Sequence, residues 1–395
     1  MTVQDTLQAV RAHEDEFIAL RRDIHQHPEL PFEELRTSDL VAARLRDWGY
    51  HVERGLGGTG VVGQLKRGDG TRTLGLRADM DALPIQETTG LQYASRNQGV
   101  MHACGHDGHT AMLLAAAKVL AEQGDFSGTL NLIFQPAEEY GTSDCGAVRM
   151  MNDGLFDKYP CDAIFSMHNM PGWPQGHLIF REGPMMASSD KVYITLVGHG
   201  GHGAVPHKAA DPVVAAASLV MALQTVVSRN VDPLQTAVVT VGVLQSGRAN
   251  NVIPDSAHLE LSVRALDSEV RSLLQQRITE IAHAQAQSFG VKAEIDYRRG
   301  YAELINSKDE TDFARQIGTE LVGAERVVPQ APPLTGSEDF AFMLEKRPGC
   351  YLLIGNGDGD KLGACMVHNP GYDFNDANLA IGAAYWALLA RRYLV

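Results

Sequence analysis

Short apolar runs separated by helical segments recur through the first part of this chain. Each run is rich in β-branched or aliphatic side chains, and the runs span residues 61–65, 74–78, 130–134 and 163–168. Helical spacing is seen at 5–24, 36–48 and, most strongly, 109–123. Strands that read as continuous apolar runs are typical of a sheet that is buried on both faces. The pattern therefore predicts an α/β fold, with a mixed, mostly parallel sheet flanked by helices.

The middle of the chain follows a different order. Residues 191–197 alternate as a strand does, and a loop rich in glycine and histidine follows at 198–207. Then come a helix, two strands, a helix and a strand, at 212–230, 236–244, 257–264, 267–288 and 292–297. This β-α-β-β-α-β order is that of a ferredoxin-like α+β unit, which closes on itself.

Beyond that unit the first pattern returns, with helices at 308–322 and 376–391 and a strand at 350–354. A chain of 395 residues also exceeds the size at which one hydrophobic core usually stops growing. We therefore expect a discontinuous domain made of residues 1–185 and 301–395, interrupted by an inserted domain at 186–300.

Charge and composition argue against several classes of protein. The formal net charge of −14 disfavours binding to nucleic acid or to an anionic membrane. Residues 1–17 lack the basic start and apolar run of a signal peptide. The apolar stretch 212–228 contains Gln224, Thr225 and two serines, so we expect a helix packed on a sheet instead of a membrane span. Five cysteines without a CxxC pair suit a reducing compartment, and we expect a cytoplasmic protein.

Side chains that bind divalent metals lie near the ends of the predicted strands and helices. They are Cys104, His106, Glu138, Glu139, His168 and His368. In an extended or looped backbone Cys104 and His106 would point the same way. Each feature alone has an ordinary interpretation, such as a buried cysteine, a solvated pair of acids or a structural histidine. Together they supply thiolate, imidazole and carboxylate groups at the sheet edge where α/β proteins bind ligands, which favours a metal site.

Seven ordered stretches resemble the hippurate hydrolase and N-acyl-amino-acid amidohydrolase family, a branch of the aminoacylase and carboxypeptidase metallohydrolases. They are LRADMDALPI (76–85), MHACGHDGHT (101–110), FQPAEE (134–139), MHNMP (167–171), GHGGHGAVPH (198–207), ANNVIP (249–254) and HNPGYDFND (368–376). The likeness extends from about residue 18 to the C-terminus. It implies a catalytic domain that binds two divalent metal ions per subunit and a lid domain that mediates assembly into a homodimer or homotetramer.

The same resemblance implies roles for individual residues. The metal ligands would be Cys104, His106, Glu139, His168 and His368, with Cys104 bridging the two ions. Glu138 would be the general base for the attacking water between the ions, and Asp79 would orient a ligand. On the inserted domain His202 would stabilise the oxyanion, in its own subunit or in the partner's. Asn251 and Arg264 would bind the α-carboxylate of the product.

The activity implied is cleavage of the amide bond of N-acyl amino acids, such as hippurate or N-acetyl amino acids, to a carboxylic acid and a free amino acid. The carboxypeptidase relatives open their site with a His-x-Asp pair, where this chain has Arg77-Ala78-Asp79. That departure favours the amidohydrolase branch and leaves Zn, Mn, Co and Ni open as the metal. A metallo-exopeptidase or dipeptidase is the alternative, and a relative that only binds a small molecule is a further one.

Overall fold

The computed structural model describes residues 2–395, which divide into two compact units. Unit 1 contains the chain up to Gly183 together with Ile305–Pro332 and Asp339–Val395. Unit 2 contains Pro184–Leu304 and the short segment Pro333–Glu338. The chain leaves unit 1 through β7 (Gly183–Met186) and returns through β14 (Leu304–Asn306). The residues 186–300 that the sequence assigns to an insertion all lie in unit 2, whereas the contribution of 333–338 has no counterpart in the sequence pattern.

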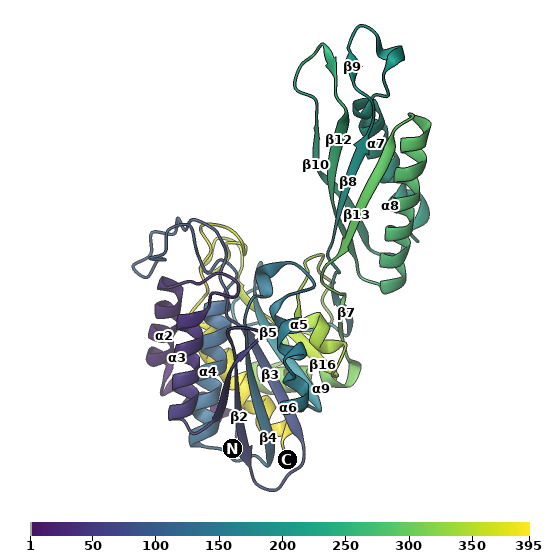
Figure 1. The fold of residues 1–395 in the computed structure, drawn as a ribbon. Helices are drawn as coiled ribbons and strands as arrows, with labels where there is room; N and C mark the ends of the chain where they lie inside the picture. The colour runs from purple at the N-terminus through teal and green to yellow at the C-terminus, as the bar shows by residue number, and fades with distance from the viewer. Residues whose placement is uncertain (1) are drawn as a thin grey trace. The chain divides into compact units, whose positions relative to one another are not determined.

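Unit 1 is built on an eight-stranded sheet with the strand order β1-β2-β4-β3-β5-β16-β6-β15 (Figure 1). The central strands β4, β3, β5 and β16 are parallel, whereas β1 and β2 run antiparallel at one edge and β6 runs antiparallel to β16. In chain order the strands are β1 (His51–Leu56), β2 (Gly60–Arg67), β3 (Thr73–Asp79), β4 (Gly128–Gln135), β5 (Ala163–Pro171), β6 (Leu178–Ile179), β15 (Val327–Val328) and β16 (Gly349–Gly357). The mixed, mostly parallel sheet expected from the sequence is confirmed.

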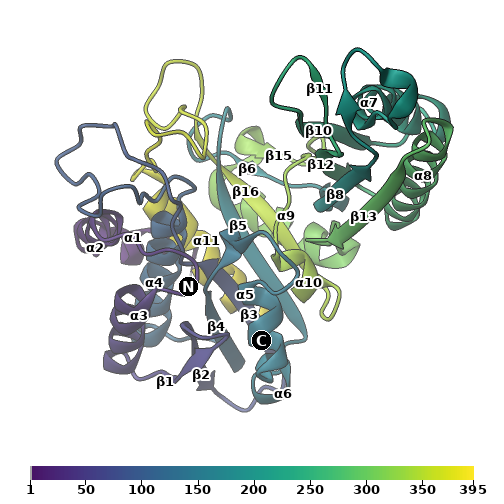
Figure 2. The same ribbon diagram turned by 45° about the horizontal axis from the view of Figure 1, so that its top comes forward.

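Helices cover both faces of this sheet (Figure 2). On one face α3, α4, α9 and α11 contact the strands, and α1 and α2 pack on α4 and α11. The shorter α5, α6 and α10 lie on the other face. Their bounds are α1 (Val3–Arg11), α2 (Glu14–Gln26), α3 (Leu35–Asp47), α4 (His106–Glu122), α5 (Gly146–Asn152), α6 (Leu155–Lys158), α9 (Lys308–Val322), α10 (Phe340–Leu344) and α11 (Asn378–Tyr393), with 3₁₀ turns η1 (Glu138–Tyr140) and η3 (Ala324–Arg326).

The expectation of one continuous helix over residues 5–24 is wrong. The structure has two helices there, α1 and α2, separated at Ala12 and His13. The first turn of α2 begins with Glu14, Asp15 and Glu16, and acidic side chains stabilise the positive end of a helix dipole. The helical periodicity is the same on both sides of the break, so the pattern alone does not reveal it.

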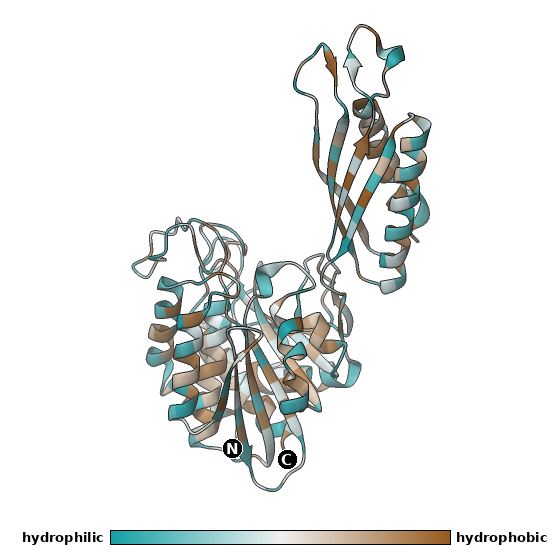
Figure 3. Ribbon diagram, viewed as in Figure 1, coloured by the Kyte–Doolittle hydropathy of each residue, from teal (hydrophilic) through white to brown (hydrophobic). Residues whose placement is uncertain are grey.

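Helix α4 is apolar around most of its circumference because it lies between the sheet and the outer helices. Leu113 and Leu114 are fully buried, and burying a leucine side chain contributes roughly 1.5–3 kcal/mol. In Figure 3 hydrophobic residues line the strands of both units, while hydrophilic ones mark the outer faces of α2, α3 and α8. A helix held on all sides in this way gives the site at its N-terminus a rigid base.

Unit 2 has the β-α-β-β-α-β order expected from the sequence. Its antiparallel sheet has the order β10-β12-β8-β13, which is the arrangement of a ferredoxin-like unit. The elements are β8 (Asp190–Val197), β9 (Gly201–His202), η2 (Pro206–Lys208), α7 (Pro212–Asn230), β10 (Ala237–Ser246), β11 (Val252–Ile253), β12 (Ser256–Ala265), α8 (Ser268–Ser288) and β13 (Lys292–Arg299).

Helix α7 is long and apolar enough to cross a membrane by length and composition. One face of it, including Leu219, Leu223 and Val226, is fully buried in the core of unit 2. The other face exposes Val214 and Met221, at 51% and 71% of their surface. The helix therefore packs on the sheet, as the sequence suggests, and leaves an apolar outer face.

Candidate metal centre

The candidate ligands of unit 1 meet at one edge of its sheet. Strands β4, β3, β5 and β16 are parallel neighbours, so their carboxyl ends lie side by side. Asp79 ends β3 opposite Gln135 of β4, and His168 lies near the end of β5 opposite Leu353 of β16. The 3₁₀ turn that contains Glu138 and Glu139 begins directly beyond β4. Sheet topology therefore gathers groups that lie far apart in the sequence.

Cys104 and Gly105 lie in a bend, as the looped alternative predicted, whereas His106 already belongs to a helix. His106 is the first residue of α4, three residues earlier than the predicted start of the helix at 109. Gly105 between them has a φ of +94°, a left-handed conformation that non-glycine residues rarely adopt. A Cβ there would also lie 2.1 Å from Nδ2 of Asn169. The tight glycine turn, not strand alternation, brings the thiol and the imidazole together.

Several groups of donor atoms lie close enough to hold metal ions. Within each group, the ligand atoms lie within 4.8 Å of one another. Among the groups that involve the candidate residues are Cys104, His106 and His168; Cys104, Glu139 and His368; His106, Glu138 and Glu139; and Asp79, His106 and His109. Cys104 belongs to both of the first two groups, so its sulfur lies between two sets of ligands.

The chemistry of these donors fits divalent metal ions. Nε2 of His106 is fully buried and has no hydrogen-bond partner anywhere in residues 2–395, which is costly unless a cation occupies its lone pair. Nδ1 of His168 lies 2.5 Å from the carbonyl oxygen of Asn169, leaving Nε2 to face the sulfur of Cys104 at 3.3 Å. Burial, with the charges of Glu139 and Glu138, raises the pKa of the Cys104 thiol well above its ordinary value. A bound cation would reverse that effect and favour the thiolate.

Asp81, which the sequence reasoning missed, connects the two ends of this cluster. Its Oδ1 lies 3.2 Å from Nδ1 of His106, and it also accepts a hydrogen bond from the backbone N–H of Glu138 at 3.1 Å. Its Oδ2 accepts from the backbone N–H of Glu139 at 2.8 Å. One buried carboxylate therefore orients an imidazole and fixes the double glutamate. The available signal was the second aspartate of Asp79-Met80-Asp81, directly after a buried strand.

Asp79 is placed to orient neighbouring groups, and it does so chiefly through a second residue that was not anticipated, His109. Its Oδ1 lies 2.6 Å from Nδ1 of His109, and its Oδ2 lies 3.8 Å from Nε2 of His106. The guanidinium of Arg77 donates to Oδ2 of Asp79 at 2.7 Å. Arg77 is buried and also donates to Gln135 and to Asp339. The guanidinium of Arg77 is thus a buried cation that holds carboxylates in place.

The backbone turn before the two glutamates is strained. Ala137 has a φ of +52°, which is uncommon for a residue with a side chain. Its N–H donates to Oε1 of Glu34 at 2.8 Å, and Glu34 also accepts a hydrogen bond from the hydroxyl of Thr59. Burial and the nearby charge of Asp81 raise the pKa of Glu34 to about 7. Such strain persists only where surrounding contacts hold it, and it concentrates at functional sites.

His368 completes the cluster from the loop before α11. Its Nε2 lies 2.9 Å from Oε1 of Glu139, and its backbone N–H donates to the carbonyl oxygen of Ala103 at 2.7 Å. Its φ is +63°, and its side chain remains 51% exposed. This histidine therefore lies on the open side of the cluster.

The remaining candidates lie in unit 2. His202 in β9 is exposed, and the neighbouring Gly203 donates its N–H to the carbonyl oxygen of Asn251 at 2.8 Å, so His202 and Asn251 lie close together. Arg264 lies near the far end of β12 and donates to the carbonyl oxygen of Thr335 and to Oγ of Ser337. At a rise of about 3.3 Å per residue, Ser256 and Arg264 are roughly 26 Å apart along this strand. The strand β12 begins beside the His202 loop, so Arg264 is not brought together with His202 and Asn251 within one unit.

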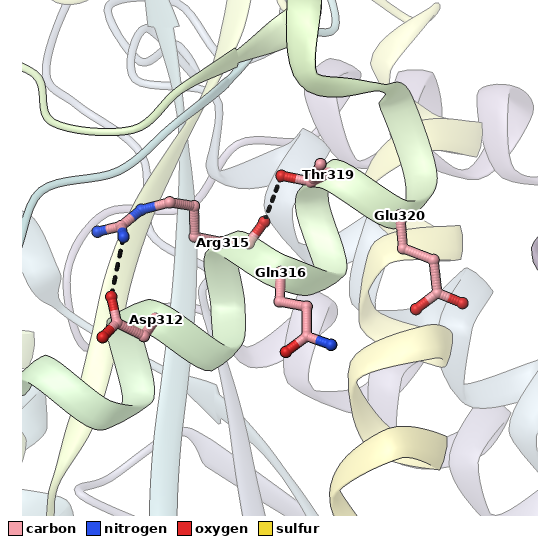
Figure 4. A pocket seen from close by; sticks show the side chains of 5 residues that line it. All are labelled: Asp312, Arg315, Gln316, Thr319 and Glu320. Carbon is pink, nitrogen blue, oxygen red and sulfur yellow. Dashed lines mark hydrogen bonds and ion pairs between the residues drawn. The ribbon is translucent and has the colours of Figure 1, made fainter.

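A separate hollow of about 620 Å³ lies on α9, lined by Asp312, Arg315, Gln316, Thr319 and Glu320 (Figure 4). Arg315 pairs with Asp312 at 2.8 Å, and Thr319 donates to the carbonyl oxygen of Arg315. Asp312, Arg315 and Thr319 therefore contact one another along a single helix face, and Glu320 pairs with Arg392. The hollow contains none of the candidate ligands.

Comparison with known proteins points to one family. The profile of peptidase family M20/M25/M40 matches residues 75–392. The chain is 47% identical to a hippurate hydrolase of Campylobacter jejuni, over 96% of this chain and 97% of that protein. It is 39% identical to an N-acetyl-L-cysteine deacetylase of Bacillus subtilis, over 94% and 86% of the two chains. A Bacillus subtilis crystal structure described as a dinuclear metal binding peptidase from the M20 family superposes with a TM-score of 0.82 and 33% identity, over 97% and 99%.

Proposed function

Because the chain belongs to peptidase family M20/M25/M40, we propose that it is a metal-dependent amidohydrolase that cleaves the amide bond of N-acyl amino acids. The observation that carries the proposal is the position of Cys104 in two ligand groups beside the buried Glu138. Relatives named for hydrolysis of hippurate and deacetylation of N-acetyl-L-cysteine support an N-acyl amino acid as the substrate.

Five residues would hold two divalent ions. Cys104, His106 and His168 form one group of donor atoms, and Cys104, Glu139 and His368 form the other, which supports Cys104 as the bridge. Thiolate and imidazole ligands suit Zn, Mn, Co or Ni. The mixture of sulfur, nitrogen and oxygen donors argues against Mg and Ca, which prefer sites made of oxygen atoms alone.

Glu138 would carry the proton during hydrolysis. Bound divalent ions would lower the pKa of a water molecule and polarise the amide carbonyl. The Glu138 side chain would take a proton from the attacking water and deliver it to the departing nitrogen. Its burial and the hydrogen bond from its backbone to Asp81 fix it for that task. General acid–base catalysis of this kind is worth about 10²–10⁴-fold in rate.

The substrate groups of unit 2 support a contribution from two chains. N-acyl amino acids are far smaller than the roughly 26 Å that separates the two ends of β12 between Ser256 and Arg264. Arg264 and the pair His202 and Asn251 could therefore act on the same bound molecule only if they came from different subunits. In that arrangement Arg264 would bind the α-carboxylate, and the partner's loop would supply the oxyanion donor.

An assembly through unit 2 agrees with its surface. Val214 and Met221 expose apolar area on α7, and β10 is an edge strand of the sheet with unpaired backbone groups on its outer side. We propose that a second copy of the chain covers this face, as a homodimer or within a homotetramer. The cysteines are all unpaired in the structure, which supports a reducing, cytoplasmic setting.

A substrate panel tests the proposed function. Metal-free protein would be loaded separately with Zn, Mn, Co or Ni and assayed on hippurate, N-acetyl amino acids and dipeptides. The proposal predicts that turnover on N-acyl amino acids exceeds turnover on dipeptides with the best metal. Faster cleavage of dipeptides would make the chain an exopeptidase. Stoichiometric metal without turnover on any of these substrates would leave only a binding role.

A further inference from the structure

One buried arginine contacts two segments that each adjoin a candidate metal ligand, the start of α4 beside His106 and the loop that follows His368. Arg21 lies in α2 and is completely buried. Its Nε forms an ion pair with Oδ2 of Asp107 at 3.0 Å. Its guanidinium also contacts Asp373 and lies 3.6 Å from Asp376. It donates a hydrogen bond to the carbonyl oxygen of Phe374 at 3.0 Å.

These partners are placed next to candidate ligands. Asp107 directly follows His106 at the start of α4, and the segment 373–376 follows His368 in the loop that leads to α11. The backbone N–H of His368 donates to the carbonyl oxygen of Ala103, next to Cys104. Arg21 therefore fixes the other end of the same loop against α4.

Each partner carboxylate is held by a second group as well. His25 lies 2.8 Å from Oδ2 of Asp107, the hydroxyl of Tyr93 donates to Asp373 at 2.7 Å, and Arg22 donates to Asp376 at 2.9 Å. Removing the guanidinium would leave buried carboxylates without their shared cation, which strongly favours rearrangement of the segments that carry them.

The loop needs this support because His368 is the most loosely held of the candidate ligands. Its side chain is half exposed, its backbone is in the left-handed region, and its ring contacts Glu139. Tyr372 in the same loop donates its hydroxyl to Oδ1 of Asn169 at 2.6 Å, and Asn169 donates to the carbonyl oxygen of Cys104 at 2.7 Å. Of the groups of donor atoms, His368 belongs only to the one that it forms with Cys104 and Glu139, so a shift of this loop would act directly on that group.

We propose that Arg21 is a positioning residue that keeps the His368 loop in register with α4, so that the ion bound by Glu139 and His368 is retained. The inference rests on the proposed metal centre. It assigns to α2, an element without a candidate ligand, control over the occupancy of one of the two ions.

The test compares Arg21→Lys with Arg391→Lys. Arg391 is also a buried arginine of unit 1, but it pairs with Asp125 and Thr6 at the opposite end of α4. Metal-free protein would be titrated with Mn²⁺, and bound metal per chain would be measured by elemental analysis after dialysis, alongside the melting temperature. Arg21→Lys should bind one ion as the wild type does and the second about 10–100-fold more weakly, with activity restored by excess Mn²⁺. Arg391→Lys should lower the melting temperature and keep both ions.

Asp376→Asn is the milder variant if Arg21→Lys does not fold, because it removes one partner of the guanidinium on the loop. It should also weaken the binding of the ion held by Glu139 and His368, by a smaller factor than Arg21→Lys does. Two tightly bound ions in both the Arg21 and the Asp376 variants would overturn the proposal. A wild-type protein that binds no Mn²⁺ and no other divalent ion would instead overturn the metal centre itself.

Discussion

Nδ1 of His106 lies 3.2 Å from Oδ1 of Asp81, and the same carboxylate receives the backbone N–H groups of Glu138 and Glu139. A candidate ligand and the candidate general base are therefore oriented by one side chain. Since a hydrogen-bonded carboxylate fixes the tautomer of a ligating imidazole, Asp81 would link the geometry of bound metal ions to the geometry of proton transfer by Glu138.

Asp81→Asn should weaken metal binding by about 10–100-fold, because the amide cannot serve His106 and both glutamate N–H groups equally well. Isothermal titration of metal-free protein measures the effect. Asp162→Asn is the matched control, since Asp162 also accepts a backbone N–H, from Thr73 at the amino end of β3. Equal affinity in Asp81→Asn and Asp162→Asn would refute the orienting role.

The Cys104→Ala variant should bind fewer than two metal ions per chain, because the sulfur of Cys104 belongs to both ligand groups. Cys161→Ala is a suitable control, as Cys161 is buried in the same unit but belongs to none of these groups. Elemental analysis of dialysed protein gives the stoichiometry. Two retained ions in the Cys104 variant would exclude a bridging thiolate.

Gly105→Ala should destabilise the protein more than Gly99→Ala. Both glycines have positive φ values, of +94° and +77°, so each substitution costs about 1–2 kcal/mol in backbone strain. A Cβ at Gly99 meets nothing within 4 Å, whereas at Gly105 it would collide with Asn169 and Tyr372. The collision adds about 1–3 kcal/mol, which urea unfolding can resolve. Equal losses in the two variants would show that the turn has room to relax.

The contribution of His25 to stability should disappear in alkaline solution. Burial disfavours its charged form, but Asp107 more than compensates, and the pKa of His25 is raised from 6.5 to about 9. A histidine whose pKa is raised on folding stabilises the folded state fully below the unfolded value and loses that effect as the pH rises through the folded value. The stability difference between wild type and His25→Gln should therefore be largest near pH 6 and shrink between pH 6.5 and 9. A difference independent of pH would mean that folding leaves the pKa of His25 unchanged.

Much of the fold follows from local patterns in the sequence. The apolar runs at 74–78 and 130–134 became β3 and β4, and the order of elements in unit 2 was visible as well. The break between α1 and α2 was not visible in the sequence, because helical spacing of apolar residues occurs on both sides of it. The short strand β15 was also missed, since two residues carry no period.

The residues of the candidate site likewise divide into those that the sequence could predict and those that only the fold reveals. Cys104, His106, Glu139, His168 and His368 could be proposed because metal-binding residue types near strand ends and helix starts are unusual, and their donor atoms do lie close together. Asp81 had a signal in its place directly after a buried strand. His109 and Arg21 could not be proposed, because their importance lies in contacts between segments far apart in the chain. Asp107 and Asp373 are surface-like residues by type, and only the fold buries them around one guanidinium.

Hydrolysis of hippurate by Glu138→Gln at full metal occupancy tests the central claim most directly. The variant keeps the shape of the side chain and the backbone contact with Asp81 but cannot accept the proton of the attacking water. Elemental analysis should find two ions per chain in the variant and in the wild type, while release of glycine falls by about 10²–10⁴-fold. Wild-type rates in a variant that carries both ions would contradict the account.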